Sequence, residues 1–189
     1  MNQRIGVIVL LSIATLGLLV SLTTRGWFRD SAEAVGVSTN YGIGLWGNSY
    51  QESCGDAVEK QSGSKCQSAT GTLEWSNLRG AKKKAWLLFG RLTLLLGVLA
   101  ALALIGLIAL TYKRDERVTK LWLLPVIGVG ATMFCAGLYL ALQPDKAGSL
   151  GYSVFVFFPS AVGALLGSLM VTGALAAPEE RPLPGIGVS

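Results

Sequence analysis

The sequence contains no histidine, and only 14% of its 189 residues are charged. Without histidine the chain lacks the side chain most used for acid–base catalysis near neutral pH and for binding metal ions. Its three cysteines could form a zinc site only with unusual additional ligands. We therefore expect a protein that is not an enzyme, with no metal ion, no cofactor and no small-molecule substrate.

Hydrophobic residues are abundant instead, at 51% of the chain, and the mean hydropathy is +0.53. Soluble domains carry about 25% charged residues, so this composition indicates a membrane protein. A helix crosses a bilayer core of about 30 Å with about 20 apolar residues. We expect four such helices in one domain covering residues 1–189, at residues 5–22, 86–112, 121–142 and 150–177.

Aromatic residues lie near the ends of the predicted helices, where membrane proteins place tryptophan and tyrosine at the two interfaces. Trp86, Tyr112, Trp122 and Tyr152 are expected in these aromatic belts. Arg91 is the one charged residue inside the second helix, close enough to its start for the long side chain to reach the lipid headgroups.

The first apolar stretch has two interpretations. Arg4 followed by an apolar run is also the pattern of a secretory signal peptide. However, the run of about 18 residues is long for such a peptide, and no A-x-A-like cleavage site follows it. We therefore favour a retained membrane helix.

The short loops predict the orientation in the membrane. Residues 113–120 include four basic and two acidic residues, whereas residues 143–149 include one of each. The excess of positive charge on cytoplasmic loops places both termini, including the tail 178–189, inside, and the long loop 23–85 outside a cell membrane. The lysines at 82–84 oppose this orientation, but they end a loop too long to be decisive. The net charge of +5 is therefore attributed to membrane flanks and not to nucleic-acid binding.

The long loop is rich in aromatic residues and glycine, which favours a packed structure over a linker. Short alternating patterns at 34–39 and 71–75 are compatible with strands of a small sheet. Cys54 and Cys66 lie in the same loop. In an oxidising compartment they can form a disulfide, and the alternative is two free thiols.

These loop residues resemble the W…GLW…C…C signature of the claudin superfamily, which includes the claudins, the peripheral myelin protein group and the gamma subunits of calcium channels. The matching residues are Trp27, Gly44, Leu45, Trp46, Cys54, Cys66 and Arg79. The resemblance implies an all-α transmembrane four-helix bundle with a small extracellular antiparallel β-sheet formed mainly by the first outer loop. It also implies that Cys54 pairs with Cys66 and that Leu45 and Trp46 anchor the sheet at the membrane. Cys54 follows Trp46 at a longer distance than in typical members, which indicates a divergent member.

Glycines in the last two helices predict close helix packing. Gly163 and Gly167 form a GxxxG pattern, which serves either self-association or, as we favour, packing within the bundle. Gly128, Gly130 and Gly137 are likewise expected to allow close approach in the third helix.

The resemblance implies function through protein contacts, in cell–cell adhesion or a paracellular barrier or channel. The alternative is an accessory subunit that modulates a membrane channel or receptor. The expected partners are membrane lipid and either a second copy of the chain or another membrane protein.

The predicted disulfide can be tested by mass mapping of the purified protein with and without reduction, combined with impermeant thiol labelling of intact cells. We expect a linked peptide containing Cys54 and Cys66 whose thiols become labelled from outside only after mild reduction. Free thiols at both positions that cannot be labelled from outside would contradict both the pairing and the orientation.

Overall fold

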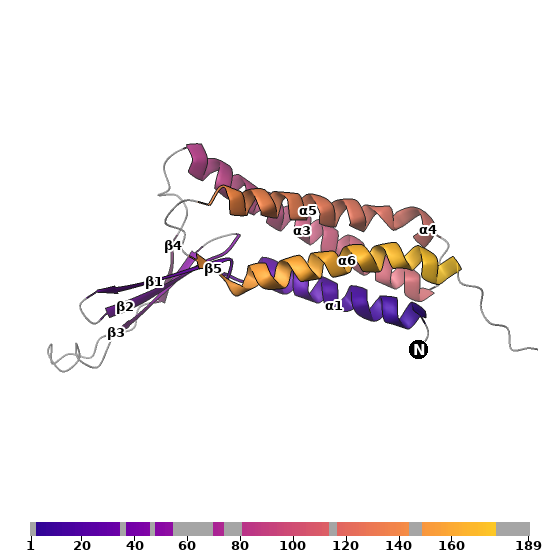
Figure 1. The fold of residues 1–189 in the computed structure, drawn as a ribbon, viewed down its shortest axis with the longest axis horizontal. Helices are drawn as coiled ribbons and strands as arrows, with labels where there is room; N and C mark the ends of the chain where they lie inside the picture. The colour runs from indigo at the N-terminus through magenta and orange to yellow at the C-terminus, as the bar shows by residue number, and fades with distance from the viewer. Residues whose placement is uncertain are drawn as a thin grey trace, which may run out of the picture.

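The fold combines four long helices with a small antiparallel sheet at one end (Figure 1). The computed structural model describes residues 3–34, 37–45, 48–54, 70–73, 81–113, 117–143 and 149–176. The long helices are α1 (Gln3–Thr23), α3 (Ala81–Lys113), α5 (Leu123–Ala141) and α6 (Tyr152–Ala176), and a short α4 (Val118–Leu121) precedes α5. All four long helices are long and apolar enough to cross a membrane. The prediction of four long apolar helices and a small antiparallel sheet is confirmed.

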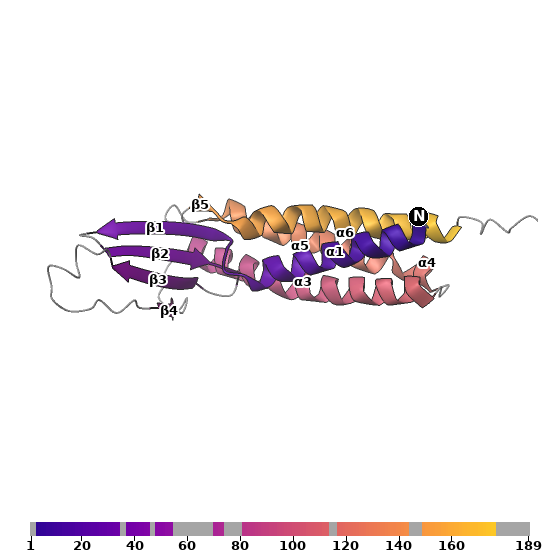
Figure 2. The ribbon, with the colours of Figure 1, turned by 90° about the horizontal axis from the view of Figure 1, so that it is seen from below.

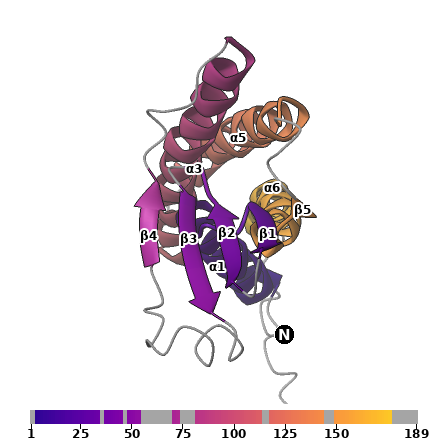
Figure 3. The same ribbon diagram turned by 90° about the vertical axis from the view of Figure 1, so that its left-hand side faces the viewer.

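The helices form a bundle in which α1 packs mainly on α6 and α3 mainly on α5. Contacts of α1 with α3 and of α5 with α6 close the bundle (Figures 2 and 3). The sheet lies at the end where α1 stops and α6 starts. The N-terminus and the last turn of α6 lie at the opposite end (Figure 1).

Glycines of α6 permit the close packing of α6 on α1. A Cβ added at Gly167 would lie 2.7 Å from Leu11, and one at Gly163 would lie 3.5 Å from the Cβ of Ala14. The GxxxG residues thus face another helix of the same bundle, as the favoured interpretation expects.

The glycines of α5 differ from the prediction. Gly128 packs closely on α3, because its Cβ would lie 3.2 Å from that of Ala100. A Cβ added at Gly130 or Gly137 would meet no other atom within 4 Å. The expectation of close approach within the chain is therefore wrong for these two residues. They lie on the outward face of α5 and not on the face that packs against α3.

Most of the buried hydroxyl groups described in the bundle form hydrogen bonds within their own helices, the exceptions being Ser153 and Tyr139 at the sheet end. Thr15, Thr93, Thr132 and Ser168 each donate a hydrogen bond of 2.7 Å to the carbonyl four residues earlier. Bonds of this kind satisfy a buried hydroxyl without linking it to a neighbour. Among the described residues, the buried polar side chains therefore form no continuous polar path along the bundle.

The sheet has five strands in the order β4-β3-β2-β1-β5, and every described pairing is antiparallel. The strands are β1 (Phe28–Ala34), β2 (Val37–Ile43), β3 (Asn48–Cys54), β4 (Thr70–Leu73) and β5 (Ser149–Leu150). The first four belong to the aromatic-rich segment between α1 and α3. β5 comes from the short segment before α6 and pairs with the start of β1, so it ties the two segments together.

The single strand expected at 34–39 is wrong. β1 ends at Ala34 and β2 begins at Val37, and these two residues pair with each other. The segment contains Gly36, and glycine commonly interrupts strands, so the alternating pattern does not correspond to one continuous strand. The strand expected at 71–75 corresponds to β4, which occupies Thr70–Leu73.

Arg4 joins α1 to α3 at the end of the bundle remote from the sheet. Its Nε and one terminal nitrogen donate to the carbonyl of Thr111 at 2.9 and 2.6 Å, and the same terminal nitrogen donates to the carbonyl of Tyr112. The last carbonyls of a helix lack partners within the helix and carry the negative end of its dipole. Arg4 therefore caps the C-terminal end of α3.

We expect Arg4→Gln to lower the free energy of unfolding by about 1–2 kcal/mol, because it removes a charged donor from these carbonyls. Thermal unfolding of the purified protein in detergent measures the change. Lys120→Gln is the control, since Lys120 is an exposed cation at the same end and should change stability by at most about 0.5 kcal/mol. Equal losses in the two variants would contradict the capping role.

Candidate functional site: the junction of sheet and bundle

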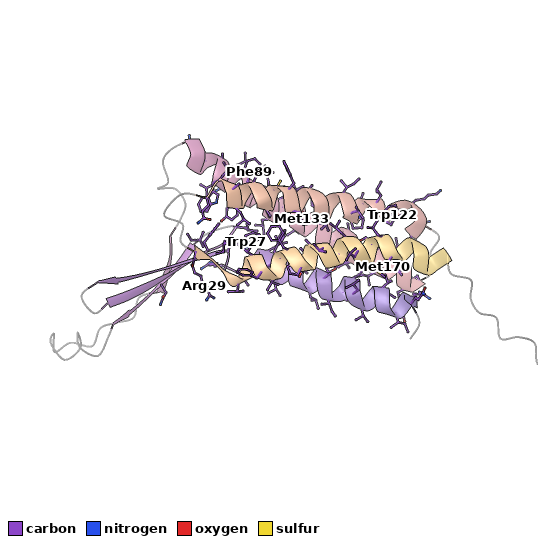
Figure 4. All side chains as sticks on the ribbon, in the orientation of Figure 1. Trp27, Arg29, Phe89, Trp122, Met133 and Met170 are labelled. Atoms are coloured by element: carbon purple, nitrogen blue, oxygen red, sulfur yellow. The ribbon has the colours of Figure 1, made fainter. Side chains whose placement is uncertain are left out.

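Trp27 is the residue at which the sheet meets the helices. It lies between the last residues of α1 and the start of β1, and its side chain is completely buried. The indole nitrogen donates a hydrogen bond of 2.8 Å to the carbonyl of Ser21 in α1. Figure 4 shows Trp27 at the sheet end of the bundle, among side chains of the surrounding helices. An indole can be buried so deeply because its one polar group has a partner.

The backbone of Trp27 is bonded on both sides as well. Its amide donates to the carbonyl of Ile43 in β2 at 2.9 Å. Its carbonyl accepts from the amide of Gly151 at 2.8 Å, and the neighbouring Gly26 carbonyl accepts from the amide of Ser153 at 3.0 Å. The residue thus connects α1, β2 and the start of α6 through its main chain and its side chain together.

Trp27 belongs to a cluster of five aromatic rings linked by mutual contacts, which we call the aromatic junction: Trp27, Phe28, Trp86, Tyr139 and Phe157. The ring of Tyr139 meets Trp27 edge-on at 5.8 Å and stacks on Trp86 at 5.0 Å with an angle of 3° between the planes. Phe157 lies 5.2 Å from Trp27, and Phe28 lies 5.6 Å from Tyr139. All five side chains are at most 1% exposed. Aromatic pairs at these distances add to the stabilisation that burial alone provides.

Tyr139 carries the contact from α5 to the GLW segment. Its hydroxyl donates a hydrogen bond of 3.1 Å to the carbonyl of Gly44. A Cβ added at Gly90 of α3 would lie 2.9 Å from the Tyr139 ring and 3.2 Å from the carbonyl oxygen of Leu45. Glycine at position 90 therefore allows α3 to approach the ring and the GLW backbone together.

The junction contains part of the signature predicted from sequence. Trp27 and Leu45 are buried in the common core, and Gly44 supplies the carbonyl that Tyr139 binds. The remaining signature residues, Trp46, Cys66 and Arg79, lie outside the described residues. The backbone of Cys54 ends β3 opposite Val37, and its side chain is not among those described, so the disulfide remains a prediction.

The sequence analysis did not identify most residues of the aromatic junction. Trp86 was expected in an interfacial aromatic belt, but it is 1% exposed and packs on Tyr139. That expectation is wrong, because proximity to a helix end does not show on which face of the helix a residue lies. Tyr139 and Phe157 carried a usable signal, since their spacing places each on the inward face of its helix.

The aromatic junction is built from buried rings and backbone hydrogen bonds. Among the described residues, no three side chains of histidine, cysteine, aspartate or glutamate come together as a metal site would require. Cys135 is a buried thiol within α5. What the junction does is fix the position of a sheet relative to four helices, through buried rings and backbone hydrogen bonds.

No protein-family model matches the chain, and no curated protein matches it significantly.

We expect Tyr139→Phe to lower the free energy of unfolding by about 1–2 kcal/mol, because it removes one hydrogen bond to a buried carbonyl and leaves the ring in place. Thermal unfolding measures this loss. Hydrogen exchange of residues 37–45 should rise in the same variant, since the bond joins α5 to this segment.

Tyr112→Phe is the matched control, because the Tyr112 side chain is 74% exposed. It should change the free energy of unfolding by at most about 0.5 kcal/mol. Unchanged exchange at 37–45 in Tyr139→Phe, or equal destabilisation in both variants, would show that the hydroxyl does not hold the segment.

Proposed function

We propose that this chain is a divergent claudin-like membrane protein that spans a cell membrane four times and acts through protein contacts of a sheet held outside the cell. In this proposal the sheet takes part in adhesion or barrier formation between membranes. The observation that carries the proposal is the aromatic junction, which fixes a sheet rigidly to the end of an apolar four-helix bundle.

The outer surface of the bundle supports a position in the membrane. Large apolar side chains are exposed along every long helix, including Ile13 on α1 (65%), Leu102 on α3 (60%), Phe134 on α5 (67%) and Phe155 on α6 (67%). A soluble protein rarely exposes apolar surface on all sides, whereas lipid favours it.

The interior supports a role other than transport through a single chain. Apart from Ser153 and Tyr139 at the sheet end, the described buried hydroxyls bond within their own helices, and no described side chain in the core is ionisable apart from Cys135 and Tyr139. Ion and proton pathways through membrane proteins depend on polar or charged groups at depth. Function is therefore expected at the outer surfaces of the molecule.

The rigid joint supports contact functions in particular. A sheet that projects from a membrane can bind a partner without a large loss of conformational entropy only if its orientation is fixed beforehand. The hydrogen bonds of Trp27 to three elements and the surrounding rings provide that fixation.

One observation favours the alternative, an accessory subunit that binds another membrane protein. Phe134 is 67% exposed on α5 and lies between Gly130 and Gly137, where added Cβ atoms would meet nothing within 4 Å. A large side chain beside two glycines is suited to packing against a neighbouring transmembrane helix.

The two functions can be separated in cells that express the chain alone with a fluorescent tag. An adhesive protein should concentrate where two expressing cells touch and stay uniform where an expressing cell touches a non-expressing one. Clustering independent of cell contact, or a uniform distribution everywhere, would contradict adhesion.

Variants assign the activity to one surface. Phe134→Ala alters α5 and leaves the junction intact, so an adhesive protein should still concentrate at contacts. Tyr139→Phe loosens the link to the sheet, so we expect enrichment at contacts to fall by about half or more. Loss in Phe134→Ala alone would favour the accessory function.

A further inference from the structure

We propose that the base of the sheet holds an anionic phospholipid, with its phosphate on Arg29 and its acyl chains along the outer face of α6. This inference rests on the proposed membrane position. It concerns a specific lipid contact and not adhesion, and it uses residues outside the aromatic junction.

Arg29 is held over an aromatic ring at the point where the sheet joins α6. Its guanidinium carbon lies 4.8 Å from the centre of the Tyr152 ring, which is a cation–π distance. Figure 4 shows Arg29 at the base of the sheet. Both side chains are exposed.

The ring beneath Arg29 is supported from its other side. A Cβ added at Gly26 would collide with the Cε1 and Cζ atoms of Tyr152, so the ring rests directly on the Gly26 backbone. The backbone bond from Ser153 to Gly26 fixes this part of α6, and the Ser149 hydroxyl donates to the carbonyl of Arg29 at 3.1 Å. These contacts therefore define the position and direction of the guanidinium relative to α6.

The chemistry of this group suits a phosphate. A guanidinium held over an aromatic ring can still present its N–H groups to a ligand, in the planar fork that matches phosphate oxygens. A cation held in this way complements a negatively charged headgroup.

The apolar surface next to Arg29 identifies a lipid as the source of that phosphate. Below Tyr152, α6 exposes Phe155, Val162, Leu166 and Leu169, at 67, 46, 53 and 49%. Their spacing places them on one stripe of the helix that begins at the cation and runs away from the sheet. A free phosphate would use only the cation, whereas a phospholipid matches the cation and the stripe together.

The test measures lipid binding to the purified full-length chain by native mass spectrometry, with phosphatidylglycerol, phosphatidylcholine and glycerol 3-phosphate as separate probes. We expect phosphatidylglycerol to bind more tightly than phosphatidylcholine, and glycerol 3-phosphate to bind negligibly. Equal binding of the two lipids, or glycerol 3-phosphate binding as well as phosphatidylglycerol, would overturn the proposal.

Variants locate the site. Arg29→Gln should raise the dissociation constant for phosphatidylglycerol about fivefold, the effect of removing one cation near a membrane surface. Arg29→Lys and Tyr152→Leu should each weaken binding as well, because the first removes the planar fork and the second removes its support. These two variants decide the question if Arg29→Gln does not fold.

Arg91→Gln is the matched control. Arg91 is exposed on α3 toward the sheet end, six residues before the Gly97 that packs on Leu22. It should change the dissociation constant by less than about twofold. Equal effects at Arg29 and Arg91 would indicate general surface charge and overturn the site.

The membrane position is tested separately by alkaline extraction of cell membranes. A chain that stays in the extracted membranes without preferring phosphatidylglycerol contradicts only the lipid site. A chain that is released contradicts the four-span proposal itself.

Discussion

Burial of the Trp27 side chain is the contact on which the relation between sheet and helices depends. The indole occupies the end of the bundle, where its nitrogen reaches α1 and its faces meet rings from α5 and α6. Its backbone bonds to β2 and to the start of α6. Because several elements meet at one residue, displacement of any of them would expose both apolar rings and unpaired backbone groups. Such shared contacts are expected to be strongly cooperative, since each bond positions the next.

The two ends of the bundle are closed by different physical means. At the sheet end, aromatic rings fill the space between the helices, and the indole nitrogen and backbone of Trp27 are hydrogen-bonded. At the other end, the guanidinium of Arg4 satisfies carbonyls that α3 cannot satisfy itself. Between the ends, hydroxyls bond within their own helices, and small residues such as Gly167 bring α6 close to α1. An interior of this kind stabilises the bundle and leaves recognition to its surfaces.

The same junction fixes the positions of those surfaces relative to one another. The backbone hydrogen bonds that hold Trp27 also fix the positions of Arg29 and Tyr152 relative to α6, because Gly26, Trp27 and Gly151 share one set of backbone hydrogen bonds. The sheet, the cation at its base and the apolar stripe on α6 therefore keep a fixed geometry relative to one another. A protein whose partners approach both from outside a membrane and within it would require such a relation.

The sequence by itself determined the four helices, because runs of about 20 apolar residues have few other stable structures. Through the resemblance, the sequence also singled out Trp27, Gly44 and Leu45 as part of a motif expected to anchor the sheet at the membrane, and the structure places these three residues at the junction. Only the tertiary structure decided their partners. Helical spacing shows that Tyr139 faces the interior of the bundle but not which ring it contacts. Trp86 is buried by stacking on Tyr139 and does not lie in the expected interfacial belt. The two-residue β5 could not be predicted from its local sequence either, since so short a strand exists only where β1 supplies its hydrogen bonds.

The role of Arg4 could not be predicted from the local sequence for the same reason. Its charge beside an apolar run is read as a membrane flank, but the end of α3, which is more than a hundred residues away in the chain, makes it a helix cap.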